Sequence, residues 1–241
     1  MGSAGDNKLK KKSIAAHQPY LFPYLGYFQI INSVEKFILM GDLQHINRGW
    51  VNRNIIQPPG QESTYFTFPI GHGKHFAPIY ENHYVQFEQK KKKYLKTMIQ
   101  YHKSKNFDEA YNLVETIFEC TSDNVADFNE FSILKICEYL NIKTDIIISE
   151  KNDDSIYRKK IQELEKTERA WYICRYYNCC HMVNAYGGIK LYDKALFREK
   201  GIELQFIKTN LTGRDTLSVI DYLMNHTRDE AIQALQDYTL I

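Results

Sequence analysis

Two prolines near the start of the chain constrain the fold more than any other feature of the sequence. Pro19 and Pro23 have fixed φ angles and disfavour helix in the residues before them, so residues 18–23 must form an irregular loop. The apolar run Ser13–His17 enters this loop and predicts a buried strand, whereas apolar residues recur at helical spacing over Tyr24–Ser33. The chain therefore passes from a strand, through a rigid loop, into a helix.

A second apolar run, Glu35–Met40, follows this helix and predicts a strand that ends at Gly41-Asp42. A strand, a helix and a strand in this order are typical of a βαβ unit, in which the two strands are parallel. Ligands of such units gather beyond the carboxyl ends of the strands. Those ends carry His17-Gln18 on the first strand and Asp42-Leu43-Gln44 on the second.

Strands and helices alternate again near the end of the chain, after a helical stretch over residues 86–141. Between these regions, residues 45–62 predict a polar loop and Thr64–Ile70 alternates as a strand does. The later predicted strands are Asp145–Ser149, the short His181–Asn184 and Ile202–Lys208. A predicted helix follows each of them, at Asp154–Tyr177, Leu191–Lys200 and Thr216–Asn225. The pattern predicts an α/β fold with a mainly parallel sheet, flanking helices and a helical middle region.

Helix ends in this pattern carry local signals. Thr121-Ser122-Asp123 resembles an N-terminal cap for the helix that runs through Leu140, and Gly201 is a stop signal for the helix before it. No internal repeat and no low-complexity linker divides the chain, so residues 11–241 are expected to form a single domain with the helical stretch as an insertion. The small, polar residues 1–10 resemble an added leader and are left out of the fold.

Charge and cysteine content exclude several classes of protein. The formal net charge is only +2, which argues against a nucleic-acid-binding protein, and the basic run Lys90–Lys93 is expected on a solvated helix face. No apolar run reaches the roughly 18 residues that a membrane span needs. The five cysteines are odd in number and follow no signal peptide, so we expect reduced thiols and a cytoplasmic protein.

Polar side chains are densest in residues 17–54, where two of them are candidates for catalysis. His17 titrates near neutral pH and is suited to moving a proton. Asp42 is suited to orienting that imidazole or to acting as a base. Structural roles are the alternative: a backbone hydrogen bond for His17, and an ion pair with Arg48 or Arg53 for Asp42.

The other polar and aromatic side chains of these two stretches are candidates for substrate binding. Arginine holds phosphate or carboxylate groups bidentately, asparagine and glutamine bond hydroxyl or amide groups, and aromatic rings stack on sugars or bases. A core position is the alternative for the single tryptophan among them. The predicted substrate-binding residues are Gln18, Tyr20, Tyr24, Gln44, Arg48, Trp50, Asn52, Arg53 and Asn54.

Other clusters carry weaker signals. Cys174, Cys179, Cys180 and His181 are crowded, but adjacent cysteines and a four-residue gap do not match the spacing of zinc ligands, so buried thiols are favoured over a metal site. His72 and His75 belong to a glycine-containing turn that favours a surface loop over a gate. No metal is predicted, and no cofactor motif is recognised.

Several segments together resemble the WbqC-like protein family. The resemblance runs in order from about residue 14 to 225, and the first two segments are its most specific part. These segments are HQPYLFPYLGYF, DLQHINRGWVNRN, TFPI, VNAYGGIKLYDKALFREKGIELQF and LSVIDYLMN. The family's segment before its YLD motif is rich in Ser and Gly, whereas this chain has Asn184-Ala185-Tyr186-Gly187-Gly188 there, which puts ligand details of that region in doubt.

The resemblance implies a bacterial protein of surface-polysaccharide, O-antigen lipopolysaccharide or amino-sugar biosynthesis, with a transferase role. Acyl or aminoacyl transfer to an amino sugar or a nucleotide-linked sugar is the expected reaction, and such a small molecule is the expected partner. Two alternatives stay open. The loop and helix at Pro19–Tyr27 and the strand ending at Asp42 are similar in layout to HIGH-motif nucleotidyl transferases, although Tyr24 and Tyr27 stand where that motif has histidines. A non-catalytic nucleotide-sugar-binding protein is the other.

Overall fold

The structure is a computed structural model that describes residues 12–71 and 77–241. Its first elements are β1 (Ser13–His17), α2 (Leu25–Ser33) and β2 (Lys36–Leu39). The strands β1 and β2 are parallel neighbours, as the βαβ prediction requires. The predicted strand, loop, helix and strand at the start of the chain are therefore confirmed.

A six-stranded sheet organises the molecule in the order β5-β2-β1-β6-β7-β8. The four strands that join β1 and β2 are β5 (Asp145–Ile148), β6 (His181–Ala185), β7 (Glu203–Thr209) and β8 (Tyr238–Leu240). The pairings among β5, β2, β1, β6 and β7 are all parallel, and only β8 pairs in the antiparallel sense. The predicted mainly parallel sheet is confirmed. The short strand predicted over His181–Asn184 is β6, which lies at the centre of the sheet beside β1.

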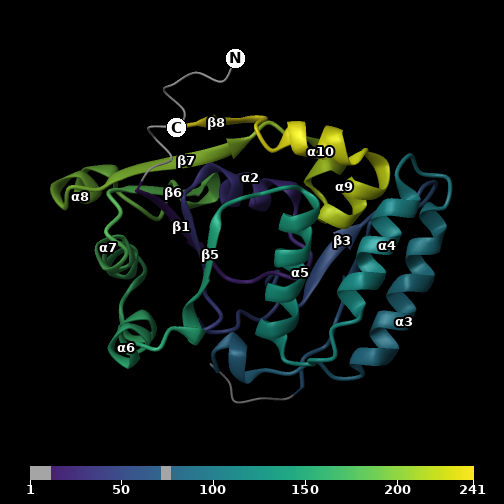
Figure 1. Cartoon of the computed structure of the whole chain (residues 1–241), viewed down its shortest axis with the longest axis horizontal. Coiled ribbons are helices and arrows are strands. Elements are labelled where there is room, and N and C mark those ends of the chain that lie inside the picture. The colour runs from purple at the N-terminus through teal and green to yellow at the C-terminus, as the bar shows by residue number, and fades with distance from the viewer. Residues whose placement is uncertain (1–11, 72–76) are drawn as a thin grey trace.

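The sheet is buried on both faces because its side chains alternate between two apolar cores. Phe37 and Val183 belong to one core, whereas Ile38 and Met182, their chain neighbours, belong to the other. Helices on both faces are what a parallel sheet needs to exclude water. Figure 1 shows α6, α7 and α8 grouped on the left of the view, and α3, α4 and α5 on the right.

The larger core contains the helical middle region that the sequence predicts. Its helices are α3 (Phe87–Met98), α4 (Phe107–Phe118) and α5 (Val125–Tyr139). Aromatic rings fill the space between them: Phe22, from the proline-bounded loop, lies 5.6 Å from Tyr94 and 6.3 Å from Phe128 between ring centroids. The insertion therefore packs against the loop that leads out of β1.

Two local predictions in this region are corrected. Asn124, rather than the preceding Thr121-Ser122-Asp123, caps α5, because its side chain accepts hydrogen bonds from the Ala126 and Asp127 amides. Lys91, in the run expected to be solvated, is only 5% exposed. Its ammonium donates to the carbonyls of Phe118 at 2.9 Å and Cys120 at 3.1 Å, at the end of α4.

The predicted helix Asp154–Tyr177 is in fact two helices, α6 (Ser155–Glu163) and α7 (Lys166–Tyr176). Leu164 and Glu165 between them are extended, with ψ angles of 144° and 160°. The guanidinium of Arg169 donates to the carbonyls of Ile161 and Leu164, each at 2.6 Å, and so satisfies groups that a continuous helix would have bonded. Leu164 and Glu165, at this break, line a cleft that is described below.

The end of the chain holds more structure than the sequence predicts. The helix expected over Thr216–Asn225 is α9 (Val219–Asn225), and beyond it α10 (Arg228–Ala234) leads into β8. The helix expected over Leu191–Lys200 is the shorter α8 (Lys194–Glu199). Away from the main sheet, β3 (Arg53–Ile56) and β4 (Thr64–Thr67) form an antiparallel pair, so the strand predicted over Thr64–Ile70 ends earlier.

Candidate functional site

A cleft of about 770 Å³ lies beyond the carboxyl ends of β1, β2 and β6. The position follows from the strand order. In the sheet, β2 lies on one side of β1 and β6 lies on the other. The connections that follow these strands therefore run in opposite directions from β1, which leaves a crevice at the carboxyl edge of the sheet. Crevices at such switch points are where open α/β sheets bind ligands. The volume is within the range of roughly 300–1,000 Å³ that is typical of small-molecule sites.

His17 lines this cleft at the last position of β1. The imidazole lies between aromatic rings, with centroids 6.0 Å from Phe37 and 5.9 Å from Tyr27, and its Nε2 is buried without a hydrogen-bond partner among the described residues. Burial lowers the pKa of His17 to about 4, because desolvation disfavours the charged ring. His17 is therefore neutral at pH 7, so one ring nitrogen donates a hydrogen bond and the other accepts one.

Asp42 lines the same cleft just after β2 and is 2% exposed. Its Oδ2 accepts a hydrogen bond from the Ser149 hydroxyl at 2.9 Å, whereas Oδ1 accepts none from the described residues. Burial raises the pKa of Asp42 to about 6, more than the hydrogen bond from Ser149 and the charge of Arg169 lower it. A carboxylate with a pKa near the working pH is well matched to general-base catalysis.

Gln18, Tyr20, Tyr24 and Gln44 also line the cleft, so four of the predicted binding residues lie together with both predicted catalytic residues. Gln18 fixes the two stretches to each other, because its amide donates to the Gln44 carbonyl at 2.9 Å. Tyr27 in turn donates its hydroxyl to the Gln18 carbonyl at 2.9 Å. These bonds hold the proline-bounded loop in one conformation at the edge of the cleft.

Asn52 and Asn54 lie outside the residues that line the cleft. The buried amide of Asn54 donates to the carbonyls of Leu21 at 3.2 Å and Phe22 at 2.7 Å, and the amide of Asn52 donates to Phe68 at 3.0 Å. Both side chains therefore brace the loops behind the cleft.

Arg48, Trp50 and Arg53 also lie away from the cleft. The guanidinium of Arg53 donates to the Gly49 carbonyl at 3.3 Å and lies over Tyr65, 4.9 Å from the ring centroid. Trp50 is 44% exposed and stacks on the same ring at 6.5 Å, so it is not a core residue. Within the described parts of the chain neither arginine forms the ion pair with Asp42 that was considered as an alternative.

Cationic and polar groups of the cleft also come from α6–α7 and from β6, which sequence reasoning did not select. Lys166 is exposed at the start of α7, and Arg169 follows it by one turn, with N–H donors beyond those used by Ile161 and Leu164. Asn184 and Tyr192 approach from the β6 side. The double glycine after β6, Gly187-Gly188, lines the cleft as well, and without side chains it lets a ligand approach the backbone closely.

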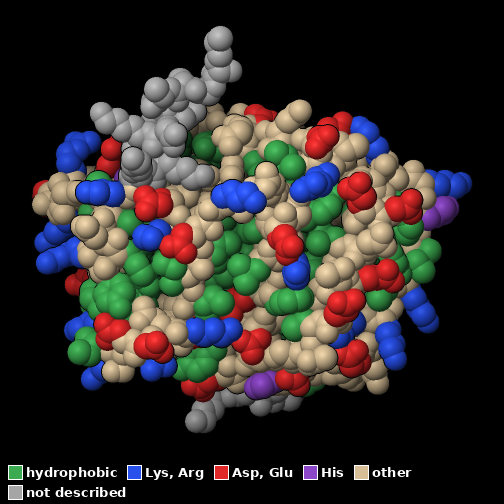
Figure 2. All heavy atoms as spheres, in the orientation of Figure 1, with side chains coloured by type: hydrophobic (Ala, Val, Ile, Leu, Met, Phe, Trp, Pro, Cys, Tyr) green, Lys and Arg blue, Asp and Glu red, His purple; other side chains and the backbone are tan. Residues whose placement is uncertain are grey.

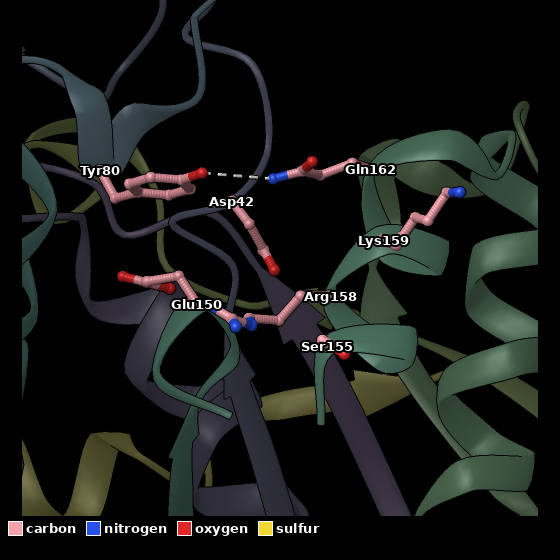
Figure 3. A pocket seen from close by; sticks show the side chains of 7 residues that line it. All are labelled: Asp42, Tyr80, Glu150, Ser155, Arg158, Lys159 and Gln162. Atoms are coloured by element: carbon pink, nitrogen blue, oxygen red, sulfur yellow. Dashed lines mark hydrogen bonds between the residues drawn. The ribbon is translucent and has the colours of Figure 1, made fainter. Parts of the chain in front are cut away.

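A second, smaller cavity of about 300 Å³ adjoins the cleft, and Asp42 and Gln162 line both. Figure 3 shows Asp42, Glu150 and Arg158 gathered on one side of it and Tyr80 facing Gln162 on another. Its lining residues are Asp42, Tyr80, Glu150, Ser155, Arg158, Lys159 and Gln162.

The cysteines take no part in either cavity. Burial raises the pKa of Cys174 to about 12 and that of Cys179 to about 11, so both thiols are protonated and poorly nucleophilic. Over residues 12–71 and 77–241, no group of three His, Cys, Asp or Glu side chains is placed to hold a metal ion. The turn with His72 and His75 lies outside the described residues.

Two further observations bear on possible partners. On the face shown in Figure 2, basic and acidic side chains of the described residues are interspersed, without one large patch of a single sign. None of the described helices is both long enough and apolar enough to cross a membrane.

Comparison with known proteins gives a family and one distant relative. The sequence model of the WbqC-like protein family matches residues 18–233, which covers most of the chain. An uncharacterised protein of Mycobacterium tuberculosis, Rv1507c, is 26% identical over 195 residues, which is 80% of each chain. No solved structure matches the chain.

Proposed function

This chain belongs to the WbqC-like protein family, and on that premise we propose that it is a transferase of bacterial surface-polysaccharide or amino-sugar biosynthesis, such as that of O-antigen. The proposed reaction is acyl or aminoacyl transfer to an amino sugar or a nucleotide-linked sugar. The observation that carries the proposal is the cleft of about 770 Å³ at the point where the strand order reverses, with the buried carboxylate of Asp42 among its lining groups.

The cleft has the recognition groups that such a substrate needs. Lys166 and Arg169 supply positive charge for phosphate oxygens, and the glycines at 187 and 188 let an anion approach the backbone closely. The rings of Tyr20 and Tyr24 offer stacking faces, while Asn184 offers an amide for sugar hydroxyls. Together these groups favour a ligand that carries both phosphate and hydroxyl groups.

Proton transfer is assigned to Asp42. The amino group of the acceptor attacks the carbonyl carbon of an activated acyl donor, such as a thioester; a C–N bond forms and the bond to the leaving group breaks. The carboxylate of Asp42 takes the proton that the nitrogen loses, since its pKa of about 6 makes it mostly ionised at neutral pH. Neutral His17 orients the reacting groups by hydrogen bonding, and its pKa of about 4 makes it the weaker base.

A second candidate is an ATP-dependent ligase or nucleotidyl transferase, and the sheet order favours it. Counted among the parallel strands alone, the order is third, second, first, fourth and fifth along the chain. That order is common among nucleotide-binding α/β folds. The two candidates differ in products, because only the second releases AMP or pyrophosphate from ATP.

The test is an incubation with UDP-linked amino sugars in the presence of acetyl-CoA, or of ATP with magnesium and amino acids, followed by mass spectrometry. Acetylated sugar, formed from acetyl-CoA without hydrolysis of ATP, is the expected result. AMP or pyrophosphate would support the second candidate instead. Binding of the sugar without any product would overturn both and leave a nucleotide-sugar-binding protein.

A further inference from the structure

The smaller cavity beside the cleft has an acidic wall. Asp42 follows β2 and Glu150 follows β5, so both carboxylates come from the same edge of the sheet. Asp42 is 2% exposed with Oδ1 unbonded among the described residues, and Figure 3 shows its carboxylate pointing into the cavity between Glu150 and Arg158. A buried acceptor without a partner is costly, so a donor from a ligand would stabilise it.

The position of Glu150 is built into the fold. Its Oε2 accepts a hydrogen bond from the Gly41 amide at 3.1 Å. Gly41 has no side chain, and a Cβ atom there would lie 2.3 Å from the Glu150 Oε1. The carboxylate therefore occupies space that only glycine leaves open.

Glu130 is buried behind this wall and shares a hydrogen bond with Glu150. Burial, and next that hydrogen bond, raise the pKa of Glu130. The Oε2 of Glu130 accepts a hydrogen bond from the Lys151 ammonium at 3.1 Å. Glu130 therefore supports the Glu150 carboxylate from behind the cavity.

The opposite wall is basic. Arg158 is exposed on α6, extends toward the acidic wall in Figure 3, and forms no ion pair within 4.0 Å among the described residues. Lys159 differs, since its ammonium lies 3.7 Å from Glu163 and points away from the cavity. On a third side the Gln162 amide donates to the Tyr80 hydroxyl at 3.5 Å.

We propose that this cavity of about 300 Å³ binds a zwitterionic α-amino acid, with its carboxylate on Arg158 and its ammonium between Asp42 and Glu150. Opposite charges face each other across the space without pairing, and a ligand with both charges bridges them. An anion alone would be repelled by two carboxylates, and a cation alone would leave Arg158 unpaired. The site adjoins the cleft through Asp42 and Gln162. The inference rests on the proposed function in its ATP-dependent form, in which ATP activates the amino-acid carboxylate, with AMP and pyrophosphate as the groups released, before the aminoacyl group passes to the acceptor.

Binding is tested on the full chain by saturation-transfer NMR with the twenty standard amino acids at low salt. The best ligand is then titrated beside its decarboxylated and deaminated analogues. We expect the amino acid to bind about tenfold or more tightly than either analogue, because each charged pair contributes separately. Failure of every amino acid to bind, or equal affinity of the analogues, would overturn the proposal.

Variants of α6 locate the site. We expect Arg158→Gln to lower the affinity for the amino acid about tenfold, to that of its decarboxylated analogue, and to leave that analogue's affinity unchanged. Lys160→Gln removes the same charge from an exposed position of the same helix that does not line the cavity, and should change neither value. Equal effects of the two variants would contradict the assignment.

Failure of this inference is distinguishable from failure of the proposed function. Binding of a UDP-linked sugar is measured on the same samples. Sugar binding without amino-acid binding overturns only the second site. Amino-acid binding without sugar binding supports the second site and counts against the main cleft as proposed.

Discussion

At the scale of single residues, Asp42 links the stability of the fold to the proposed chemistry. Burial raises the pKa of Asp42 from 3.8 to about 6, so the folded state binds this proton more tightly than the unfolded chain. By linkage, ionised Asp42 destabilises the fold, and the cost grows as the pH rises from about 4 to about 6. We expect Asp42→Asn to raise the free energy of unfolding by up to about 3 kcal/mol at pH 7.5 and to change it little at pH 4, as measured by urea unfolding.

The same variant should lose activity, which is what separates a functional carboxylate from a structural one. For the wild-type protein we expect kcat/KM to rise with pH through about 6, and for Asp42→Asn to fall about 10²–10⁴-fold. Asp153→Asn, at an exposed position, serves as the control and should change neither property. An Asp42→Asn protein that is fully active, whatever its stability, would count against the base assignment.

His17 predicts a pH dependence of the opposite sign. Its pKa falls from 6.5 to about 4 on folding, so the unfolded chain binds the proton more tightly. Stability is therefore lost as the pH decreases from about 6.5 to about 4, by up to about 3 kcal/mol. We expect His17→Gln to remove this part of the acid destabilisation in urea titrations, and the exposed His102→Gln to retain it. Identical acid profiles for the two variants would show that His17 does not titrate this way.

The type of a residue alone does not show whether its side chain binds a ligand or holds a loop in place. Asn54 and Gln18 have the same amide chemistry and were both predicted to bind substrate. Asn54 is 6% exposed and its amide donates to the carbonyls of Leu21 and Phe22 behind the cleft. Gln18 lines the cleft, although its amide also donates to the Gln44 carbonyl. The difference lies in where the tertiary fold places each side chain.

At the scale of elements, the break between α6 and α7 shapes one side of the cleft. Arg169 bonds the carbonyls of Ile161 and Leu164, and hydrogen bonds of charged donors contribute about 1.5–3 kcal/mol each. We expect Arg169→Gln to lower the free energy of unfolding by about 3–6 kcal/mol in urea. Arg175→Gln removes an exposed guanidinium from the same helix, so it should cost under about 1 kcal/mol. Equal losses would mean that Arg169 does not hold the break.

Elements with their own local signals were predicted, and elements made by tertiary contacts were not. The prolines at 19 and 23 and the apolar runs on either side specify β1, α2 and β2 without reference to the rest of the chain. Leu164 and Glu165 are residues that favour helix, so the sequence does not predict the break between α6 and α7. Their extended conformation is held by the hydrogen bonds of Arg169. The three-residue β8 is too short to be periodic, and it exists through pairing with β7.

At the scale of the whole molecule, the sheet order assembles the candidate site from distant parts of the sequence. His17 and Asp42 lie 25 positions apart and were placed together by the βαβ pattern. Lys166, Arg169 and Asn184 join them only because β6 pairs with β1 and α7 packs beside it. That pairing spans more than half of the chain and leaves no local signature. The part of the lining that follows β1 and β2 was therefore predictable, and the cationic part on α7 was not.

The central claim, that this cleft binds a nucleotide-linked sugar, is tested most directly by the thermal shift that UDP-N-acetylglucosamine produces. A ligand at 100 times its Kd stabilises a protein by about 2.7 kcal/mol, which is roughly 5–10 °C in Tm for a domain of this size. Lys166→Glu reverses a charge inside the cleft, whereas Arg48→Glu reverses one that the sequence selected but that lies outside it. We expect a shift that is lost in Lys166→Glu and kept in Arg48→Glu. No shift, or a shift that Lys166→Glu retains, would rule out a nucleotide-sugar site in the cleft.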